Sequence, residues 1–283
     1  MSSYAYYPGC VLKGAAKELA EATESVCNTL NIDLKELRTF SCCGAGALEE
    51  LNEEWEILVN ARNLAYAEKE DLDIVTPCST CLLVLRNTYN KLLSDDKLLE
   101  KVNNKLKNFG LKFTGKKNIY HILWVLHDNL EKIKSLVKRP LKNIKVYPFY
   151  GCHTIRPYRI LGYEPSENPK SIDNLVKACG GEPVRGLKNI VCCGFHAQFT
   201  FPQGYKKLLD MVYKEAQELK ADCIVTPCPL CHMQMEMYNP LNFPILHVPQ
   251  LIGLALGISS KALGLHRNLS PVKKLFEKLF RGN

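Results

Sequence analysis

Ten of the 13 cysteines follow a five-cysteine pattern that occurs twice in the chain. Each copy has one isolated cysteine, then two adjacent cysteines, then a Cys-x-x-Cys pair. The first copy is Cys10, Cys42, Cys43, Cys78 and Cys81, and the second is Cys152, Cys192, Cys193, Cys228 and Cys231. In both copies, 35 positions separate the double cysteine from the closing pair (43 to 78 and 193 to 228). Such self-similarity indicates an internal duplication with the cysteines as its fixed points.

Clustered cysteines of this kind predict metal or redox chemistry. The N-terminus lacks the basic and apolar regions of a secretory signal peptide, so we expect a cytoplasmic chain with reduced thiols. A structural zinc site and a conventional [4Fe–4S] cubane each close at four ligands, so five is one too many for either. Either one cysteine of each copy is idle, or an unusual cluster uses all five. The less favoured alternative is two structural zinc sites, since zinc motifs usually pair two local Cys-x-x-Cys knuckles.

The composition is that of a soluble globular protein with two domains of ordinary size. The chain has 283 residues, 46% of them hydrophobic and 23% charged, and a formal net charge of +8. This positive charge suits an acidic partner, an anionic substrate or anionic lipid, whereas no motif for nucleic acid is present. The longest apolar run, Leu251 to Ile258, is too short to cross a bilayer. The remaining cysteines are expected to be small buried hydrophobic residues: Cys27, Cys179 and Cys223.

Each cysteine group follows an apolar strand and precedes a helix. In the first half we expect strands at 4–7, 37–40 and 73–76, and helices at 14–30, 51–70, 80–109 and 120–139. In the second half we expect strands at 145–149, 187–191, 222–226 and 244–248, and helices at 170–179, 205–219 and 251–258. This alternation predicts an α/β fold with parallel sheets, whose strand C-terminal ends commonly bind ligands. We expect two tandem domains related by a pseudo-twofold axis, at 1–140 and 141–264, followed by a segment at 265–283.

The cysteines and their neighbours resemble a known family. The matching segments, which cover nearly the whole chain to about Gly264, are Tyr7-Pro-Gly-Cys10, Gly151-Cys-His153, Thr226-Pro-Cys-Pro-Leu-Cys-His232 and Leu251-Ile-Gly-Leu-Ala-Leu-Gly257. The pattern resembles the CCG domain, and two copies resemble the B subunit of heterodisulfide reductase. The resemblance implies one noncubane [4Fe–4S] cluster per half, held by all five cysteines. One departure is the bulky segment from Gly194 to Phe199, where the family commonly has glycine.

The resemblance also implies a reaction and partners. Two clusters would face each other across the interface and reduce a disulfide between them, or oxidise thiols in reverse, in a complex with a flavin-bearing A subunit together with a ferredoxin-like C subunit. One alternative is a sulfur-oxidation subunit that acts on a lipoyl carrier protein. Another is a pure electron-transfer subunit, which would not need a matched pair of motifs. A zinc-stabilised interaction module is a further alternative.

Several polar residues beside the cysteines are candidates for a role in the reaction. His153 and His196 are candidate catalytic residues that supply protons near a thiolate product. The alternative is that such histidines cap backbone groups or donate to a cluster sulfur, and we favour that interpretation for His232. Three basic residues just beyond Cys10 and Cys152 are candidates for binding an anionic substrate, although they also fit a solvated face: Lys13, Arg156 and Arg159.

The C-terminal segment has the pattern of a short basic amphipathic helix. Ser270-Pro271 predicts its N-cap and first residue. Apolar residues recur at helical spacing at Val272, Leu275, Phe276, Leu279 and Phe280, and basic residues occupy the other face at Lys273, Lys274, Lys278 and Arg281. The helix either packs on its own domain or places residues 270–283 on a partner subunit or on the inner face of the membrane. We slightly favour the second interpretation, because the segment follows a loose polar stretch.

Overall fold

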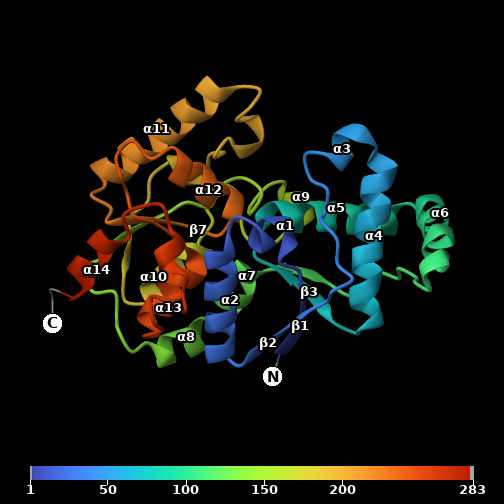
Figure 1. Cartoon of the computed structure of the whole chain (residues 1–283), viewed down its shortest axis with the longest axis horizontal. Coiled ribbons are helices and arrows are strands. Elements are labelled where there is room, and N and C mark those ends of the chain that lie inside the picture. Colours follow the sequence, from blue (N-terminus) through green and yellow to red (C-terminus); the bar gives the residue numbers. More distant parts are fainter. Residues whose placement is uncertain (1, 281–283) are drawn as a thin grey trace.

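The structure, a computed structural model, describes residues 2–280 apart from the side chains at 276 and 280, and contains two four-stranded parallel sheets. The first sheet has the order β2-β1-β3-β4, and the second has the order β6-β5-β7-β8. The strands of the first are β1 (Ser2–Tyr6), β2 (Ile32–Glu36), β3 (Asp73–Thr76) and β4 (Ile119–His121). Those of the second are β5 (Lys145–Pro148), β6 (Glu182–Pro183), β7 (Cys223–Thr226) and β8 (Ile245–His247). The identical strand order confirms the predicted α/β fold with two related halves (Figure 1).

Helices follow the strands in the same sequence in both halves (Figure 1). The first half contains α1 (Gly9–Lys13), α2 (Lys17–Thr29), α3 (Leu48–Leu51), α4 (Glu53–Lys69), α5 (Ser79–Ser94), α6 (Asp96–Leu106), the 3-10 turn η1 (Lys107–Phe109), α7 (Ile122–Asp128) and α8 (Leu130–Leu136). The second half contains α9 (Tyr158–Leu161), α10 (Ser171–Ala178), η2 (Lys188–Ile190), η3 (Phe195–Ala197), α11 (Pro202–Glu218), α12 (Pro229–Met237), α13 (Val248–Ala255), η4 (Leu265–Arg267) and α14 (Lys273–Phe280).

The central strands of each sheet deliver the cysteines to one edge. β1 pairs with β3 so that Tyr6 is opposite Val75, and β5 pairs with β7 so that Pro148 is opposite Val225. The chain leaves β1 toward β2 on one side, and leaves β3 toward β4 on the other. Between two such strands lies the topological switch point, where parallel sheets usually bind ligands. The cysteines that follow β1 and β3 therefore emerge on either side of this crevice.

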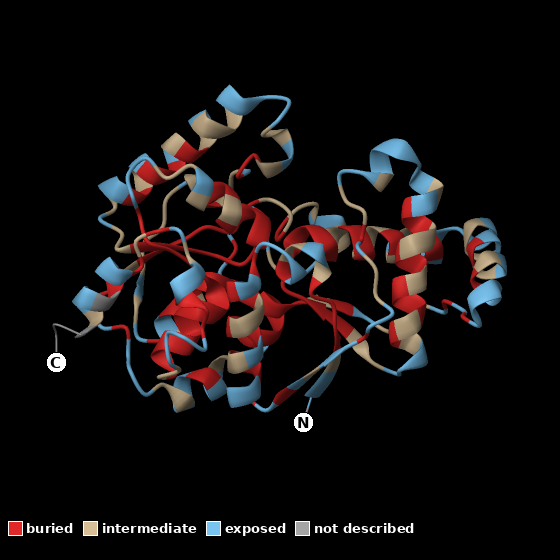
Figure 2. Ribbon diagram, in the orientation of Figure 1, coloured by how far each residue is buried: buried red, intermediate tan, exposed pale blue. Residues whose placement is uncertain are grey.

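The two domains pack through equivalent helices. α2 contacts α13, while α10 contacts α7 and α8; α1 contacts α12, while α5 contacts α9. Because α2 and α10 hold the same place in the two domains, as do α7 and α13, these contacts follow a pseudo-twofold relation. One continuous core joins Leu19 and Val26 of α2 to Leu251 and Ile252 of α13. Buried segments accordingly run through both sheets and the helices between them (Figure 2). In the sequence, all strands of the first sheet precede residue 140 and all strands of the second sheet follow it. The exact domain boundaries stay a prediction.

Several predicted elements are wrong in detail. The strand expected at 37–40 is a turn, because the alternating Ile32–Glu36 segment pairs with β1 instead. The strand expected at 187–191 contains the 3-10 turn η2, and the pairing segment is the short β6. The helix expected at 80–109 is interrupted at Asp95, whose carboxylate caps α6 by accepting from the amide of Leu98 at 3.0 Å. The prediction of a helix at 120–139 missed β4, the strand that completes the first sheet.

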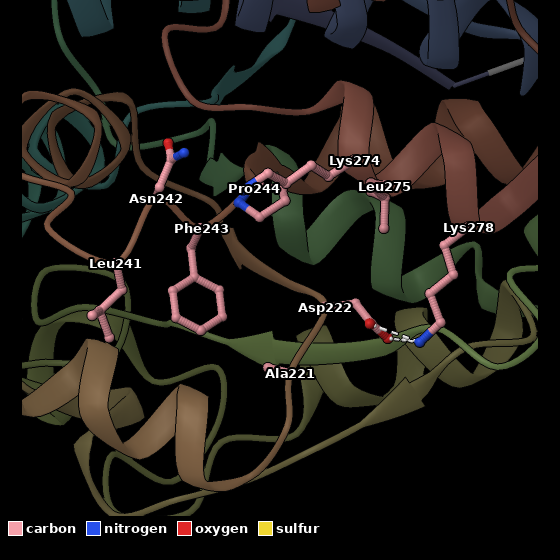
Figure 3. Close-up of a pocket in the computed structure, with 9 residues that line it drawn as sticks. All are labelled: Ala221, Asp222, Leu241, Asn242, Phe243, Pro244, Lys274, Leu275 and Lys278. Carbon is pink, nitrogen blue, oxygen red and sulfur yellow. Dashed lines mark hydrogen bonds and ion pairs between the residues drawn. The ribbon is translucent and has the colours of Figure 1, made fainter.

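The C-terminal helix packs on its own domain. Its helical residues begin at Lys273 rather than after Ser270, whose hydroxyl donates to Glu236 at 2.8 Å. Val272 and Leu275 are buried, and Lys278 pairs with Asp222 at 2.7 Å beside a hollow (Figure 3). For these residues the structure favours the first interpretation of the segment over the membrane-facing one. Arg281 and the side chains of Phe276 and Phe280 lie outside the described residues. No helix within residues 2–280 combines the length and apolar character needed to cross a bilayer.

Candidate metal-cluster site

The structure brings the ten patterned cysteines to corresponding positions in the two domains. Cys10 lies in α1 directly after β1, and Cys78 caps α5 directly after β3, with Cys81 in the first turn of that helix. Cys42 and Cys43 lie in the loop between β2 and α3. In the second domain, Cys228 and Cys231 hold the same places on α12, and the other three lie in loops. The isolated cysteine and the Cys-x-x-Cys pair of each set therefore follow strands as the sequence predicts, whereas the double cysteines lie in longer loops.

Within each set, the five thiols shift the pKa of their neighbours in an unbroken series. The series runs Cys10, Cys42, Cys43, Cys81, Cys78 in the first domain, and Cys152, Cys192, Cys193, Cys231, Cys228 in the second. The sulfurs of Cys43 and Cys81 are 3.5 Å apart, and those of Cys152 and Cys192 are 3.8 Å apart. All of these cysteines are free thiols. Five contiguous, reduced sulfur atoms are a donor set that fits iron–sulfur chemistry.

The packed thiols stabilise the thiolate form of Cys43 in the first set and lower the pKa of both Cys192 and Cys228 in the second. Hydrogen bonds from Cys42 and Cys81 lower the pKa of Cys43 to about 3. Hydrogen bonds from Cys152 and Cys193 likewise lower the pKa of Cys192 to about 2. Since a metal binds the thiolate form, this arrangement favours metal binding. By contrast, burial raises the pKa of Cys27 and of Cys179 to about 12, and also raises that of Cys223, in keeping with their expected role as buried hydrophobic residues.

A glycine after each double cysteine shapes the loop around it. Gly44 and Gly194 have φ angles of 78° and 75°, a region that other residues rarely adopt. Their amides donate to the sulfurs of Cys42 and Cys192, at 3.4 and 3.3 Å. A Cβ atom would lie 2.5 Å from Leu48 in the first loop and 2.3 Å from Tyr205 in the second. The turn therefore requires glycine directly after the double cysteine. In this turn the glycine amide holds the sulfur of the first cysteine of each pair.

Polar side chains that the sequence analysis missed hold the loop before Cys42. Asn63 accepts from the amide of Ser41 at 3.0 Å, and the hydroxyl of Tyr7 donates to the Ser41 carbonyl at 2.5 Å. Asn60 donates to the carbonyl of Cys43 at 2.9 Å. Both asparagines are buried on α4. Asparagines on the apolar face of the predicted 51–70 helix were the signal that could have identified them.

The two cysteine sets meet at the domain interface. Cys78 and Cys228 each shift the pKa of the other, so these two thiols are neighbours across the interface. Beside them, Nδ1 of His153 lies 3.0 Å from the hydroxyl of Thr80 in the other domain, and the rings of His153 and His196 are 5.6 Å apart. Burial lowers the pKa of His153.

A small interdomain cavity is lined by residues that include Ser79, Thr80, Cys152, His153, His196 and Cys228. The predicted histidines are therefore both at the interface.

The three predicted substrate-binding cations are not at this cavity. Lys13 pairs with Glu36 at 2.7 Å, Arg156 donates to the carbonyl of Ile190 at 3.0 Å, and Arg159 is exposed on α9. Among the described residues that line the cavity, none is lysine or arginine. Their expected role in binding an anionic substrate stays a prediction, and it does not concern this cavity. His232 is fully buried and contacts the carbonyl of Ile245 at 3.3 Å, as the favoured structural interpretation requires.

Comparison with known proteins identifies the family. The family described as Cysteine-rich domain (CCG) matches residues 4–86 and 146–236. The B subunit of the ferredoxin/F420H2-dependent CoB-CoM heterodisulfide reductase of Methanosarcina acetivorans is 30% identical, over 99% of this chain and 98% of its own length. The chain belongs to the heterodisulfide reductase B-subunit family. It is an iron–sulfur, heterodisulfide-reductase-like component of a complex of several subunits.

Other relatives of this heterodisulfide reductase B-type chain are named for different functions. The 8-methylmenaquinol:fumarate reductase membrane anchor subunit of Wolinella succinogenes is 41% identical, over 96% of this chain and 98% of its own length. A heterodisulfide reductase B-subunit-like protein of Archaeoglobus profundus is 31% identical over 91% of both chains. The crystal structure of a hypothetical protein from Helicobacter pylori superposes with a TM-score of 0.73 at 14% identity, covering 94% of this chain and 51% of that one. This last likeness shows the fold alone.

Proposed function

We propose that each five-cysteine set holds one noncubane [4Fe–4S] cluster, and that the pair exchanges electrons with a quinone-class molecule in a membrane-associated complex. The observation that carries the proposal is the meeting of the two domains directly beside the cysteines, where the hydroxyl of Ser79 lies 2.6 Å from the hydroxyl of Thr154 and that of Thr80 lies 3.0 Å from Nδ1 of His153. When bound, the clusters supply one-electron transfer. Two adjacent one-electron groups match a molecule that gives or takes two electrons.

The polarity of the interface favours an uncharged redox molecule. An anionic substrate needs cations to replace its hydration, and the cavity lining described above has no lysine or arginine. The segments that follow the two double cysteines instead expose large apolar side chains, namely Leu51, Trp55, Phe199 and Phe201. In Figure 1 these segments, at α3 and just before α11, rise from the same side of the molecule. The relative that is 41% identical is named for 8-methylmenaquinol, a molecule of this class.

The chain's own residues would position and protonate that molecule. Thr80 fixes Nδ1 of His153 at 3.0 Å, which leaves Nε2 of the ring for exchanging a proton. His196 lies beside His153 and provides a second imidazole. Quinol oxidation releases protons together with electrons, so imidazoles adjacent to the sulfurs are suited to accept them.

The second candidate is disulfide reduction, or thiol oxidation in reverse, with a flavin-bearing A subunit plus a ferredoxin-like C subunit as partners. The matched pair of complete cysteine sets favours it, because two facing clusters would each take one sulfur of a disulfide. The relatives named as B subunits of heterodisulfide reductase also support it. A lipoyl carrier protein is the corresponding protein substrate. In either case we place the chain peripherally on the cytoplasmic face of the membrane; the relative named a membrane anchor supports the association with a membrane.

One experiment separates the two candidates. The complete complex is purified anaerobically and assayed both for oxidation of a reduced naphthoquinone by an artificial acceptor and for reduction of a small disulfide by reduced viologen. We expect quinol oxidation that is lost in Cys228→Ser, with disulfide reduction at background. Cys179→Ala is the matched control, because this cysteine is buried outside both sets. Disulfide reduction without quinol oxidation would replace the first candidate by the second.

A further inference from the structure

The domains meet beside the cysteines through two equivalent contacts of unlike polarity. Each contact brings the two residues inside a Cys-x-x-Cys motif of one domain to the two residues that follow the isolated cysteine of the other. The polar contact consists of Ser79, Thr80, His153 and Thr154. The apolar contact consists of Pro229, Leu230, Val11 and Leu12. Four side chains that can hydrogen-bond in one contact thus correspond to four hydrocarbon side chains in the other.

The polar contact borders the second cysteine set. Among the described residues that line the interdomain cavity, the cysteines are all five of the second set and none of the first. All four residues of the polar contact line the same cavity, together with Leu230 of the apolar one. A cluster held by the second set would therefore have the polar contact as its neighbour on the side of the first domain.

The hydrogen bonds of the polar contact have a definite direction at Ser79. Burial lowers the pKa of His121 to about 4, so its ring is neutral. Nδ1 of this ring accepts from the amide of Leu123 at 3.1 Å, which places the hydrogen on Nε2. Nε2, 3.3 Å from the Ser79 hydroxyl, therefore cannot accept from it, and Ser79 donates to the hydroxyl oxygen of Thr154 at 2.6 Å. The hydrogen of Thr154, a residue that lines the cavity, is left without an acceptor among residues 2–280.

A second hydrogen is left over between Thr80 and His153. The Thr80 hydroxyl lies 3.0 Å from Nδ1 of the ring. If the hydroxyl donates, the ring's own hydrogen is on Nε2, and if Nδ1 donates, the hydroxyl hydrogen is unused. In both cases one hydrogen of the pair has no acceptor within the described part of the chain. Unpaired donors are costly in an interior, and the sulfur atoms beside the cavity are acceptors that can take them.

The polar side chains described beside the first set donate to the backbone instead. Tyr7 and Asn63 both donate to the carbonyl of Ser41, at 2.5 and 3.2 Å. Asn60 donates to the carbonyl of Cys43 at 2.9 Å. The glycine amides donate to one sulfur in each set, so they do not distinguish the two sets. The sets therefore differ in the side-chain donors at the domain interface.

Given the clusters of the proposed function, we propose that the hydroxyl of Thr154, oriented by Ser79 and His121, donates a hydrogen bond to the second cluster and raises its reduction potential. Hydrogen bonds to the sulfurs stabilise the additional negative charge of a reduced cluster. Ser79 and His121 are positioning residues, because they act only through Thr154. The contribution is confined to the second cluster, so two clusters with equal sets of ligands are unequal as electron carriers, whatever the substrate.

The test is a redox titration of the anaerobically purified, iron-loaded protein, followed by electron paramagnetic resonance. The two signals are assigned with Cys193→Ser, in which the first cluster alone is expected. In Thr154→Val, which keeps the shape of the side chain, we expect reduction of the second cluster to be disfavoured about fivefold, the effect of one lost hydrogen bond. This factor corresponds to ~40 mV for one electron at 59 mV per tenfold. The potential of the first cluster and the iron content should stay unchanged, and Thr154→Ser, which keeps the hydroxyl, should behave as the unmodified protein.

Ser79→Ala is the matched control, because it breaks the same contact between the domains but leaves the donor on Thr154. We expect less than half of the shift seen in Thr154→Val. Equal shifts in the two variants would mean that the contact matters only for packing, and an unchanged potential in Thr154→Val would equally overturn the proposal.

Thr154→Ala repeats the test with a smaller side chain. Loss of the second cluster from both Thr154→Ala and Thr154→Val would show that Thr154 holds its loop in place, and would also overturn the proposal. Absence of any iron–sulfur signal from the unmodified protein would refute the proposed function together with this inference. An unchanged potential in the presence of both signals would refute the inference alone.

Discussion

A Cβ atom placed on Gly9 would lie 3.0 Å from the sulfur of Cys81, and one placed on Gly151 would lie 2.9 Å from the sulfur of Cys231. Both glycines have positive φ angles, 72° and 71°. The backbone before the first cysteine of each set therefore touches the last cysteine of the same set. This approach holds each set together, because it brings the loop after the first strand of each domain onto the helix after the third. Only glycine permits it.

Gly151→Ala should release the second cluster and spare the first. The added methyl group would displace Cys231, and the positive φ would add backbone strain. We expect the iron content to fall by about half, measured on anaerobically purified protein, since each cluster has about four irons. Gly110→Ala is the control, because Gly110 also has a positive φ, 64°, but no atom within 4 Å of the added carbon. Full iron in Gly151→Ala would mean that Cys231 is not a ligand.

Cys193→Ser should remove the second cluster and abolish turnover, and leave the first cluster with about four irons. Cys193 is in the middle of its sulfur series, between Cys192 and Cys231. Cys27→Ala, Cys179→Ala and Cys223→Ala should each keep all the iron, because these thiols lie outside both series. Iron analysis with electron paramagnetic resonance checks both statements. Turnover near that of the unmodified protein in Cys193→Ser would favour a relay in which only one cluster reacts.

The cysteine pattern predicted the fold and the composition of the candidate site because it combines two independent signals. An apolar strand before each cysteine group places that group at a sheet edge, and the duplication requires two such edges. The strands around Val75 and Val225 were predicted nearly to the residue, since they are short, apolar and bounded by the cysteines. The edge strands were misplaced because β2 and β6 are half-exposed and carry charged residues, so pairing with the central strand decides their position.

Contacts between the domains could not be predicted in the same way. Thr80 lies inside the first Cys-x-x-Cys pair, yet its partner His153 is 73 positions away, and only the pseudo-twofold packing of helices brings them together. The partners of Lys13 and Arg156 are likewise set by the fold, since a position next to a cysteine does not determine which groups a side chain contacts. Sequence spacing determines which residues reach an edge, whereas tertiary packing determines which of them face one another.

Thr80→Val should reduce turnover without loss of iron. The substitution keeps the shape of the side chain and removes the hydroxyl that holds Nδ1 of His153. Loss of one neutral hydrogen bond costs ~1 kcal/mol, which corresponds to a fall in turnover of about fivefold if the orientation of the ring matters to the reaction. Thr29→Val is the control, because its hydroxyl donates to Ser25 on an exposed part of α2. Turnover and iron content are measured on the same samples, and equal turnover in the two variants would remove His153 from the proposed reaction.

Deletion of residues 270–283 should destabilise the chain, because part of this segment is built into the second domain. Val272 and Leu275 are buried, and Ser270 bonds to Glu236 and to the backbone of Ile245. Each buried aliphatic side chain contributes about 1.5–3 kcal/mol, so we expect a loss of up to about 6 kcal/mol before allowance for residual structure in the unfolded chain. Urea denaturation of the iron-loaded protein measures this loss.

Two single substitutions separate packing from charge in the same segment. Leu275→Ala should lower the free energy of unfolding by about 2–5 kcal/mol, since it empties a buried site. Lys278→Met should change it by no more than ~1 kcal/mol, because its ion pair with Asp222 is largely exposed on the lysine side. Sedimentation with anionic vesicles is measured for the same proteins. If the deletion leaves stability intact but abolishes vesicle binding, the segment serves the membrane and its packing on the domain contributes little.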